Sequence, residues 1–255
     1  MYPQIEILGV TIYTFGLALS ISFILFFFML YRLSEKFGIN ANFFLGNVLW
    51  FFLSMFVFSR FFYIIAELRD FQFLWSQGIL KFLLMSDYNF SLMGGILGFM
   101  IVLLFQLKRF KISSRKYIDA IVLSFLFASI IGFIGAFFGG QIYGRPTDSF
   151  MGIVAMGDMN NIPYTSSTFP LALLYSFTSF LLFFCLYLVR KFINIEGLVW
   201  YVGILLFSII LLIAEFYSGG TDIFKSYISF NLNQIGAILL LLFGVRWLYF
   251  IYKDK

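Results

Sequence analysis

The sequence predicts an all-α integral membrane protein: a bundle of about seven transmembrane helices, with the N-terminus outside and the C-terminus cytoplasmic. Composition is the first observation, because hydrophobic residues make up 62% of the 255 residues and charged residues only 11%. Soluble domains are roughly half apolar and about a quarter charged. A soluble fold of this length could not shield so much apolar surface from water. The other two observations are the long apolar runs and the position of the basic residues between them.

The apolar runs predict the individual spans. A bilayer core requires about 20 apolar residues per helix. No basic segment precedes the first run, so we expect an uncleaved span there and not a signal peptide. We expect a single transmembrane domain over residues 1–255, with spans at about Gly9–Tyr31, Phe43–Ile65, Phe90–Leu107, Tyr117–Phe138, Phe169–Val189, Gly197–Tyr217 and Gln234–Tyr252.

Two other segments have distinct compositions. Phe71–Met85 is apolar but is interrupted by Gln77, Gly78 and Lys81. It is too short to span, and we expect an interfacial or re-entrant helix. Gly139–Thr168 is the only sizeable polar segment, and we expect it to be an extracytoplasmic loop. Loops of this length in compact domains are often functional.

Basic residues predict the orientation. The loops after the first, third and fifth runs, together with the C-terminal end, carry twelve of them: Arg32, Lys36, Lys108, Arg109, Lys111, Arg115, Lys116, Arg190, Lys191, Arg246, Lys253 and Lys255. The opposite loops carry four, which are Arg69, Lys81, Arg145 and Lys225. Cytoplasmic loops are enriched in Lys and Arg, which places the N-terminus outside and the C-terminus in the cytoplasm.

The net charge of +5 does not indicate nucleic acid binding, because the basic residues lie in short loops between apolar runs. There is no histidine in the chain. Its absence removes the commonest general base and the commonest metal ligand. We therefore expect no metal, no cofactor and no nucleic-acid partner.

Ionisable residues at membrane depth cost free energy unless they are paired or hydrated, so each is a candidate functional residue. Arg60 lies near the outer end of the second expected span and Glu215 near the outer end of the sixth. Gln141, Tyr143 and Arg145 follow the fourth. These polar groups are expected at the level of a phospholipid headgroup. Arginine binds phosphate oxygens through two parallel hydrogen bonds, so one interpretation is a phosphate site.

The alternative interpretation is an Arg60–Glu215 ion pair that joins two helices, with Arg145 extended into the headgroups. The glycines of this region also have two explanations. They permit close helix packing, or they let backbone amides approach an anionic headgroup. The glycines concerned are Gly94, Gly95, Gly132, Gly135, Gly139 and Gly140.

Several segments in the same order resemble the prolipoprotein diacylglyceryl transferase family, whose members move diacylglyceryl from phosphatidylglycerol to a lipobox cysteine. Ser59-Arg60-Phe61-Phe62-Tyr63 resembles the family's Gly-Ala-Arg-x-x-Tyr stretch, and Ser91 to Gly95 is similar to its Ser-Phe-His-Gly-Gly. Gly132 to Thr147 resembles its Gly-Arg-x-Gly-Asn-Phe-x-Asn-Gly-Glu-x-x-Gly-Arg motif, and Leu211 to Phe216 its Arg-Phe-x-x-Glu-Phe. Ile12 to Leu17 resembles its first-span motif, and Phe169-Pro170 with Tyr175 roughly matches its His-Pro…Tyr segment.

The resemblance implies seven spans in a bacterial-type cytoplasmic membrane, a phospholipid partner such as phosphatidylglycerol, and a prolipoprotein signal peptide as second partner. It assigns Glu215 and Arg145 to catalysis. It assigns to lipid binding Arg60, Tyr63, Gly94, Gly95, Gly140, Gln141, Tyr143 and Gly144.

This chain departs from the family at several polar positions. Met93 stands where the family has His, Phe133 where it has Arg, Gln141 where it has Glu, and Leu211 where it has a second Arg. Ala136 and Gly139 replace the Asn residues. Three hypotheses follow: a diacylglyceryl transferase that uses Arg60, Arg145 and Glu215; an inactive relative that holds phospholipid or a lipoprotein signal segment; and a small transporter.

Overall fold

The computed structural model describes residues 4–7, 10–66, 91–154, 162–193, 195–220 and 229–253 of the chain. The chain divides into two compact units, and each is described by itself. The first unit comprises Met1–Ala41, Arg115–Gly220 and Ala237–Lys255, and the second comprises Asn42–Ser114 and Thr221–Gly236. The expectation of a single transmembrane domain stays a prediction.

The prediction of a multi-span helical membrane protein is confirmed. Within the described residues, six helices are long and apolar enough to cross a membrane. They are α1 (Thr14–Phe37), α3 (Val48–Ala66), α6 (Leu92–Arg109), α7 (Ser114–Phe138), α8 (Leu171–Phe192) and α9 (Leu198–Ala214), the last continued by the 3₁₀ turn η1 (Glu215–Tyr217). The seventh expected span corresponds to α11 (Leu232–Lys253).

The first expected span begins later than predicted. An antiparallel hairpin of β1 (Gln4–Ile7) and β2 (Val10–Tyr13) occupies the start of the chain, and helix α1 begins only at Thr14. The sequence from Gln4 to Tyr13 is rich in β-branched residues, which favour strands. The helix also ends later, because Gly38 adopts the left-handed conformation (φ 63°) that closes it.

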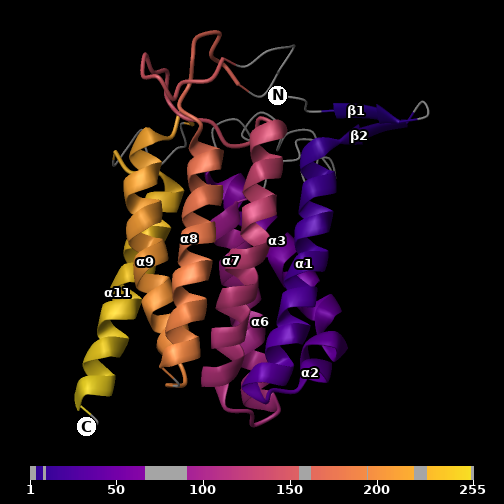
Figure 1. The fold of residues 1–255 in the computed structure, drawn as a ribbon, viewed down its shortest axis with the longest axis vertical. Helices are drawn as coiled ribbons and strands as arrows, with labels where there is room; N and C mark the ends of the chain where they lie inside the picture. Colours follow the sequence, from indigo (N-terminus) through magenta and orange to yellow (C-terminus); the bar gives the residue numbers. More distant parts are fainter. Residues whose placement is uncertain are drawn as a thin grey trace. The chain divides into compact units, whose positions relative to one another are not determined.

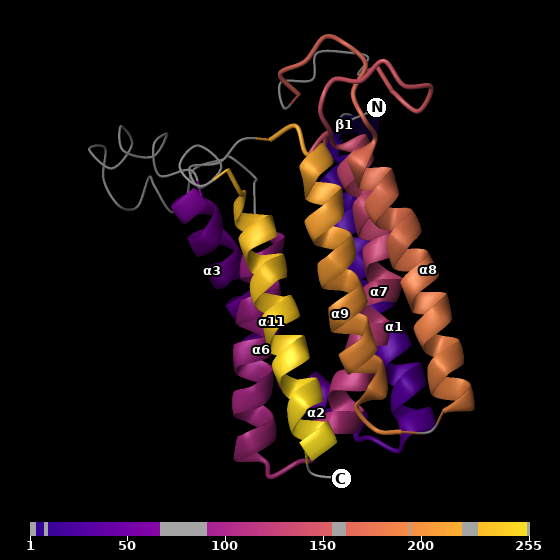
Figure 2. The same cartoon turned by 90° about the vertical axis from the view of Figure 1, so that its left-hand side faces the viewer.

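Helices α1 and α7 of the first unit pack closely along a row of glycines. Added Cβ atoms on Gly135 and Gly139 would overlap the Cβ atoms of Ala18 and Phe15 of α1, and one on Gly132 would lie 3.3 Å from Ser22 Oγ. These positions recur at three- and four-residue spacing, so they share one helix face. Figures 1 and 2 show α1, α7, α8 and α9 of the first unit running alongside one another.

In the second unit, the short helix α2 (Ala41–Gly46) precedes α3, which packs against α6. A Cβ on Gly94 would overlap the Phe58 carbonyl oxygen, and one on Gly98 would overlap that of Ser54. This Gly-x-x-x-Gly spacing is typical of close helix pairs in membranes. The Ser59 hydroxyl donates to the Ser91 carbonyl oxygen at 2.8 Å and joins the same two helices.

Helix α11 begins with a capping box. The backbone N–H of Gln234 donates to Asn231 Oδ1 at 2.8 Å, and the backbone N–H of Asn231 donates to Gln234 Oε1 at 3.0 Å. This exchange satisfies two backbone donors at the helix start. The interfacial helix expected at Phe71–Met85 lies outside the described residues, as does the 155–161 part of the expected loop.

Candidate lipid-binding site

The carboxylate of Glu215 lies at the end of α9, in the first unit, and it is buried with 4% of its surface exposed. Tyr175 of α8 donates its hydroxyl hydrogen to Glu215 Oε1 at 2.8 Å. The Phe133 ring of α7 packs on Tyr175 with centroids 5.2 Å apart. Residues of α7, α8 and α9 thus form one cluster, and a buried carboxylate of this kind requires the partner that Tyr175 provides.

The backbone of Arg145 joins three chain segments. Its N–H donates to the Tyr217 carbonyl oxygen at 2.8 Å, and its own carbonyl oxygen accepts from the Phe169 N–H at 3.0 Å. The neighbouring Gly144 N–H donates to the Phe169 carbonyl oxygen at 3.0 Å, and the Gly219 N–H donates to that of Tyr143 at 3.1 Å. This junction connects the ends of α7 and α9 with the start of α8, so the position of Arg145 is determined by all three.

The side chain of Arg145 is exposed, although its Nε donates to the Ser218 carbonyl oxygen at 3.3 Å. It lines an open pocket of about 460 Å³. The pocket combines one cation with hydroxyl and aromatic groups, and its lining comprises Arg145, Pro146, Thr147, Ser149, Met151, Phe169, Phe216 and Tyr217. Phe169 and Tyr217 pack together with centroids 5.2 Å apart. An anion held by the guanidinium would therefore have an apolar wall beside it.

Other residues predicted for the site lie in the turn after α7. Gly140 has φ 66°, its N–H donates to the Phe137 carbonyl oxygen, and the Gln141 N–H donates to that of Ala136. This is a Schellman motif, in which glycine is favoured by its left-handed backbone. A Cβ on Gly144 would overlap the Phe169 carbonyl oxygen. Gly140 and Gly144 thus have conformational and packing roles, and Tyr143 packs edge-on against Tyr164 at 6.1 Å.

Arg60, Tyr63, Gly94 and Gly95 belong to the second unit. Arg60 is buried, and its guanidinium carbon lies 5.6 Å from the centre of the Tyr63 ring. The Gly94 N–H donates to Ser91 Oγ and the Gly95 N–H to the Ser91 carbonyl oxygen. Both amides are used within α6, so packing explains Gly94 better than contact with a headgroup. The phosphate site expected to include Arg60, and the alternative Arg60–Glu215 ion pair, both stay predictions.

Four residues that the resemblance aligns with polar positions of the family have buried side chains. Phe133 and Leu211 are 6% and 2% exposed, and Ala136 and Met93 are also buried. Phe133 contacts Tyr175, as described above, and the Met93 side chain lies against Gly236 of α11. None of these four residues offers a hydrogen-bond donor or a charge at its position.

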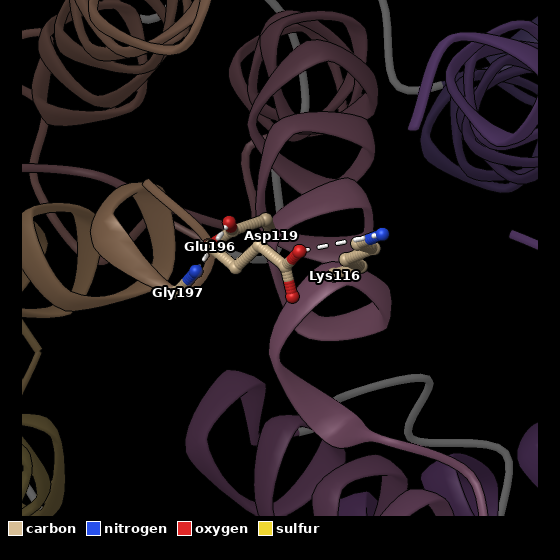
Figure 3. A network of polar contacts seen from close by, with 4 residues as sticks. All are labelled: Lys116, Asp119, Glu196 and Gly197. Carbon is tan, nitrogen blue, oxygen red and sulfur yellow. Dashed lines mark hydrogen bonds and ion pairs between the residues drawn. The ribbon is translucent and has the colours of Figure 1, made fainter. Parts of the chain in front are cut away.

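Asp119 is a buried polar residue that sequence reasoning missed. It lies in α7 at the opposite end of the first unit from Arg145, and its carboxylate accepts from the Gly197 N–H at 2.7 Å and the Trp200 N–H at 2.9 Å (Figure 3). These donors open α9, whose N-cap residue Gly197 has no side chain. Lys116 and Glu196 form an exposed ion pair beside it at 3.3 Å. Its position inside the expected span Tyr117–Phe138 could have marked Asp119 as a buried polar residue.

Arg190 also differs from the sequence-based expectation of a loop cation. It lies in the last turn of α8 and is buried, with its guanidinium carbon 4.8 Å from the centre of the Phe37 ring. The apolar run was expected to end at Val189, but the helix continues to Phe192. Long side chains at helix ends cover neighbouring apolar surface in this way.

The chain is similar to known proteins over most of its length. The family model described as prolipoprotein diacylglyceryl transferase matches residues 3–250. Similar curated proteins are named phosphatidylglycerol–prolipoprotein diacylglyceryl transferase. The one from Clostridium tetani is 26% identical over 218 residues, covering 84% of each chain. The one from Campylobacter curvus is 26% identical over 163 residues, 63% of this chain and 57% of that protein.

A third relative, from Campylobacter hominis, is 28% identical over 153 residues, which make up 59% of this chain and 52% of that protein. The chain thus spans about half the length of both Campylobacter relatives that it matches.

Proposed function

Because the chain belongs to the prolipoprotein diacylglyceryl transferase family, we propose that it binds phosphatidylglycerol in the pocket beside Arg145. The observation that carries this proposal is the combination of an anchored, exposed guanidinium with the aromatic wall of Phe169, Phe216 and Tyr217. A phosphate diester would accept two parallel hydrogen bonds from the guanidinium. The glycerol and the first acyl carbons would lie on the aromatic side.

The level of the pocket supports a lipid ligand. It lies where α7 ends and α8 begins, next to helices that are long and apolar enough to cross a membrane. The distribution of basic residues predicts that this end lies at the extracytoplasmic side of a bacterial-type cytoplasmic membrane. An outer-leaflet phospholipid would present its headgroup at this level.

We further propose that the chain binds its lipid without transferring diacylglyceryl. Transfer would form a carbon–sulfur bond to a cysteine and break the carbon–oxygen bond to glycerol phosphate. Donors aimed at the departing phosphate stabilise such a step. Phe133, Leu211 and Met93 occupy the positions of the family's Arg, Arg and His with buried apolar side chains. Their burial supports a lipid-holding role, with a prolipoprotein signal segment as the second candidate ligand.

A second candidate function is diacylglyceryl transfer by a reduced site. The specific observation in its favour is the Tyr175–Glu215 hydrogen bond of 2.8 Å. Glu215 would take the thiol proton, Tyr175 would orient the carboxylate, and Arg145 would hold the departing phosphate. Lipid binding without transfer requires only the Arg145 pocket, whereas diacylglyceryl transfer requires Glu215, Tyr175 and Arg145 together.

Binding is tested with a photoreactive phosphatidylglycerol in nanodiscs that contain the purified protein. We expect crosslinking within the Arg145 pocket, and a reduction of about tenfold in labelling with Arg145→Gln. Lys191→Gln is the matched control, because Lys191 is an exposed cation on the last turn of α8. Equal labelling of Arg145→Gln and the unaltered protein would contradict the lipid site. Phosphatidylcholine with the same photoreactive group reports labelling that is independent of headgroup.

A further inference from the structure

The hairpin of β1 and β2 has two chemically different faces. Directly opposite residues of an antiparallel pair share a face, and successive residues alternate between faces. Ile5 pairs with Ile12, so these two aliphatic side chains lie together. Glu6 pairs with Thr11 and Gln4 with Tyr13, so the other face carries polar groups and a tyrosine.

The aliphatic pair Ile5 and Ile12 is only partly covered within the described structure. Ile5 is 40% exposed and Ile12 is only partly buried. Figure 1 shows the hairpin leaving the N-terminal end of α1 sideways, away from α7 and α8 of the same unit. A lone two-stranded hairpin is marginally stable in water. Its persistence therefore requires a surface that accepts the aliphatic face.

The face of α1 that begins next to the hairpin indicates what that surface is. Strand β2 ends at Tyr13 and α1 begins at the next residue, Thr14. Several large apolar side chains of α1, including Leu17, Ile21 and Ile24, are exposed on a helix that is long and apolar enough to cross a membrane. Lipid is the solvent for that surface, so the hairpin starts at the level where lipid ends. The exposed Tyr13 is a residue typical of that interface.

We propose that the hairpin lies on the bilayer surface, with Ile5 and Ile12 immersed among the lipids and Glu6 and Thr11 in water. It forms a short interfacial arm that extends the lipid contact of α1 sideways. An amphipathic interfacial helix lies in the membrane surface in the same way, but in this hairpin apolar and polar side chains alternate at every second residue. The occupant of the aliphatic face is the membrane itself.

Site-directed spin labelling tests the arrangement. Cys185 is the single cysteine, so a Cys185→Ser background accepts single labels at Ile5→Cys, Ile12→Cys, Glu6→Cys and Thr11→Cys. Labels in lipid collide mainly with dissolved oxygen, whereas labels in water collide mainly with a polar nickel complex. In phosphatidylglycerol-containing nanodiscs we expect the first two labels to favour oxygen at least threefold, and the other two to favour nickel.

Two labels calibrate the scale. Ile24→Cys on the exposed face of α1 supplies the lipid value, and Phe150→Cys, at a position 93% exposed in the loop after α7, supplies the water value. Four hairpin labels that all match Phe150→Cys would overturn the proposal, and so would four that all match Ile24→Cys. As a second measurement, an Ile12→Gln change should move the Ile5→Cys label toward the water value. No shift in that label would also contradict a lipid-held face.

Discussion

The Tyr175 hydroxyl and the Glu215 carboxylate are 2.8 Å apart, and their hydrogen bond joins α8 to the end of α9. Glu215 belongs to the same turn as Tyr217, whose main chain accepts a hydrogen bond from Arg145 in the junction after α7. The one acidic side chain that the sequence placed at this membrane level is therefore part of the packing between helices as well as a candidate proton acceptor.

Replacing Tyr175 by phenylalanine should lower stability. The change removes a donor to a buried carboxylate and keeps the ring that packs on Phe133. We expect a loss of about 1–3 kcal/mol, measured as a lower thermal midpoint in detergent micelles. Tyr217→Phe is the matched control, since Tyr217 is half exposed. A Tyr175→Phe midpoint equal to that of the control would show that the bond does not contribute.

Replacing Asp119 by alanine should destabilise the opposite end of α9. Two backbone donors, those of Gly197 and Trp200, would lose their acceptor inside the protein. Loss of a helix cap costs about 0.5–2 kcal/mol, and burial places this site at the upper end. Asp119→Asn keeps one oxygen and should lose less. Glu196→Gln breaks only the exposed ion pair with Lys116, which contributes about 0–1 kcal/mol. Thermal midpoints in the order Glu196→Gln, Asp119→Asn, Asp119→Ala, from highest to lowest, are the expected result.

Gly135 should not tolerate a side chain. An added Cβ would overlap the Cβ of Ala18, and both helices would have to separate. We expect Gly135→Ala to lose about 1–3 kcal/mol, the usual cost of overpacking. Gly16→Ala provides the comparison, because nothing lies within 4 Å of a Cβ at that position of α1. Its thermal midpoint should stay the same or rise slightly, as expected for alanine in a helix. A stable Gly135→Ala protein would exclude this close contact.

The chain should not restore growth to cells depleted of their own diacylglyceryl transferase. Removing one preorganised donor commonly costs about 10²–10³ in rate, and several positions have become apolar together. Losses need not add when groups act as a unit, but one alone is serious. Labelled lipid followed onto a lipobox peptide provides the direct measurement. Transfer above background that is abolished by Glu215→Gln or Arg145→Ala would establish the reduced-site transferase instead.

Topology reporters should separate the two ends of the bundle. A reporter fused after Lys255 and one inserted in Lys108–Lys116 should report cytoplasm, and one near Asp158 should report the outside. The excess of basic residues on one set of loops is the reason. An outside signal at Lys108–Lys116 would reverse the orientation and place the Arg145 pocket at the inner leaflet.

Sequence alone predicted the parts of this structure that depend on hydropathy. The long apolar runs became helices, and a bilayer-length requirement is enough to identify them. The sequence did not predict the hairpin, because Val10 to Tyr13 is mostly apolar and continues directly into the run of α1. Apolar content cannot distinguish strand from helix over so few residues.

The binding and catalytic roles that the sequence predicted for the candidate site residues stay predictions. Arg145 and Glu215 are brought to the same end of the first unit, through the bonds of Tyr217 and Tyr175. The role of Asp119 as a cap for α9 could not be predicted. The N-cap residue of that helix, Gly197, has no side chain, and Asp119 lies 78 positions away in the sequence. Such a contact is set by tertiary packing and leaves no local pattern.

The junction at Arg145 also bears on how this lineage can vary. The loop after it returns to its own base, where the Thr147 N–H donates to the Ser167 carbonyl oxygen at 2.9 Å and Ile153 and Thr168 exchange main-chain hydrogen bonds. Because the loop is fastened where it leaves the bundle, its length is uncoupled from the placement of the guanidinium. Doubling a flexible loop costs only about 0.6 kcal/mol in closure entropy. Insertions and deletions in this segment can therefore accumulate among relatives, while the residues at its base keep their spacing.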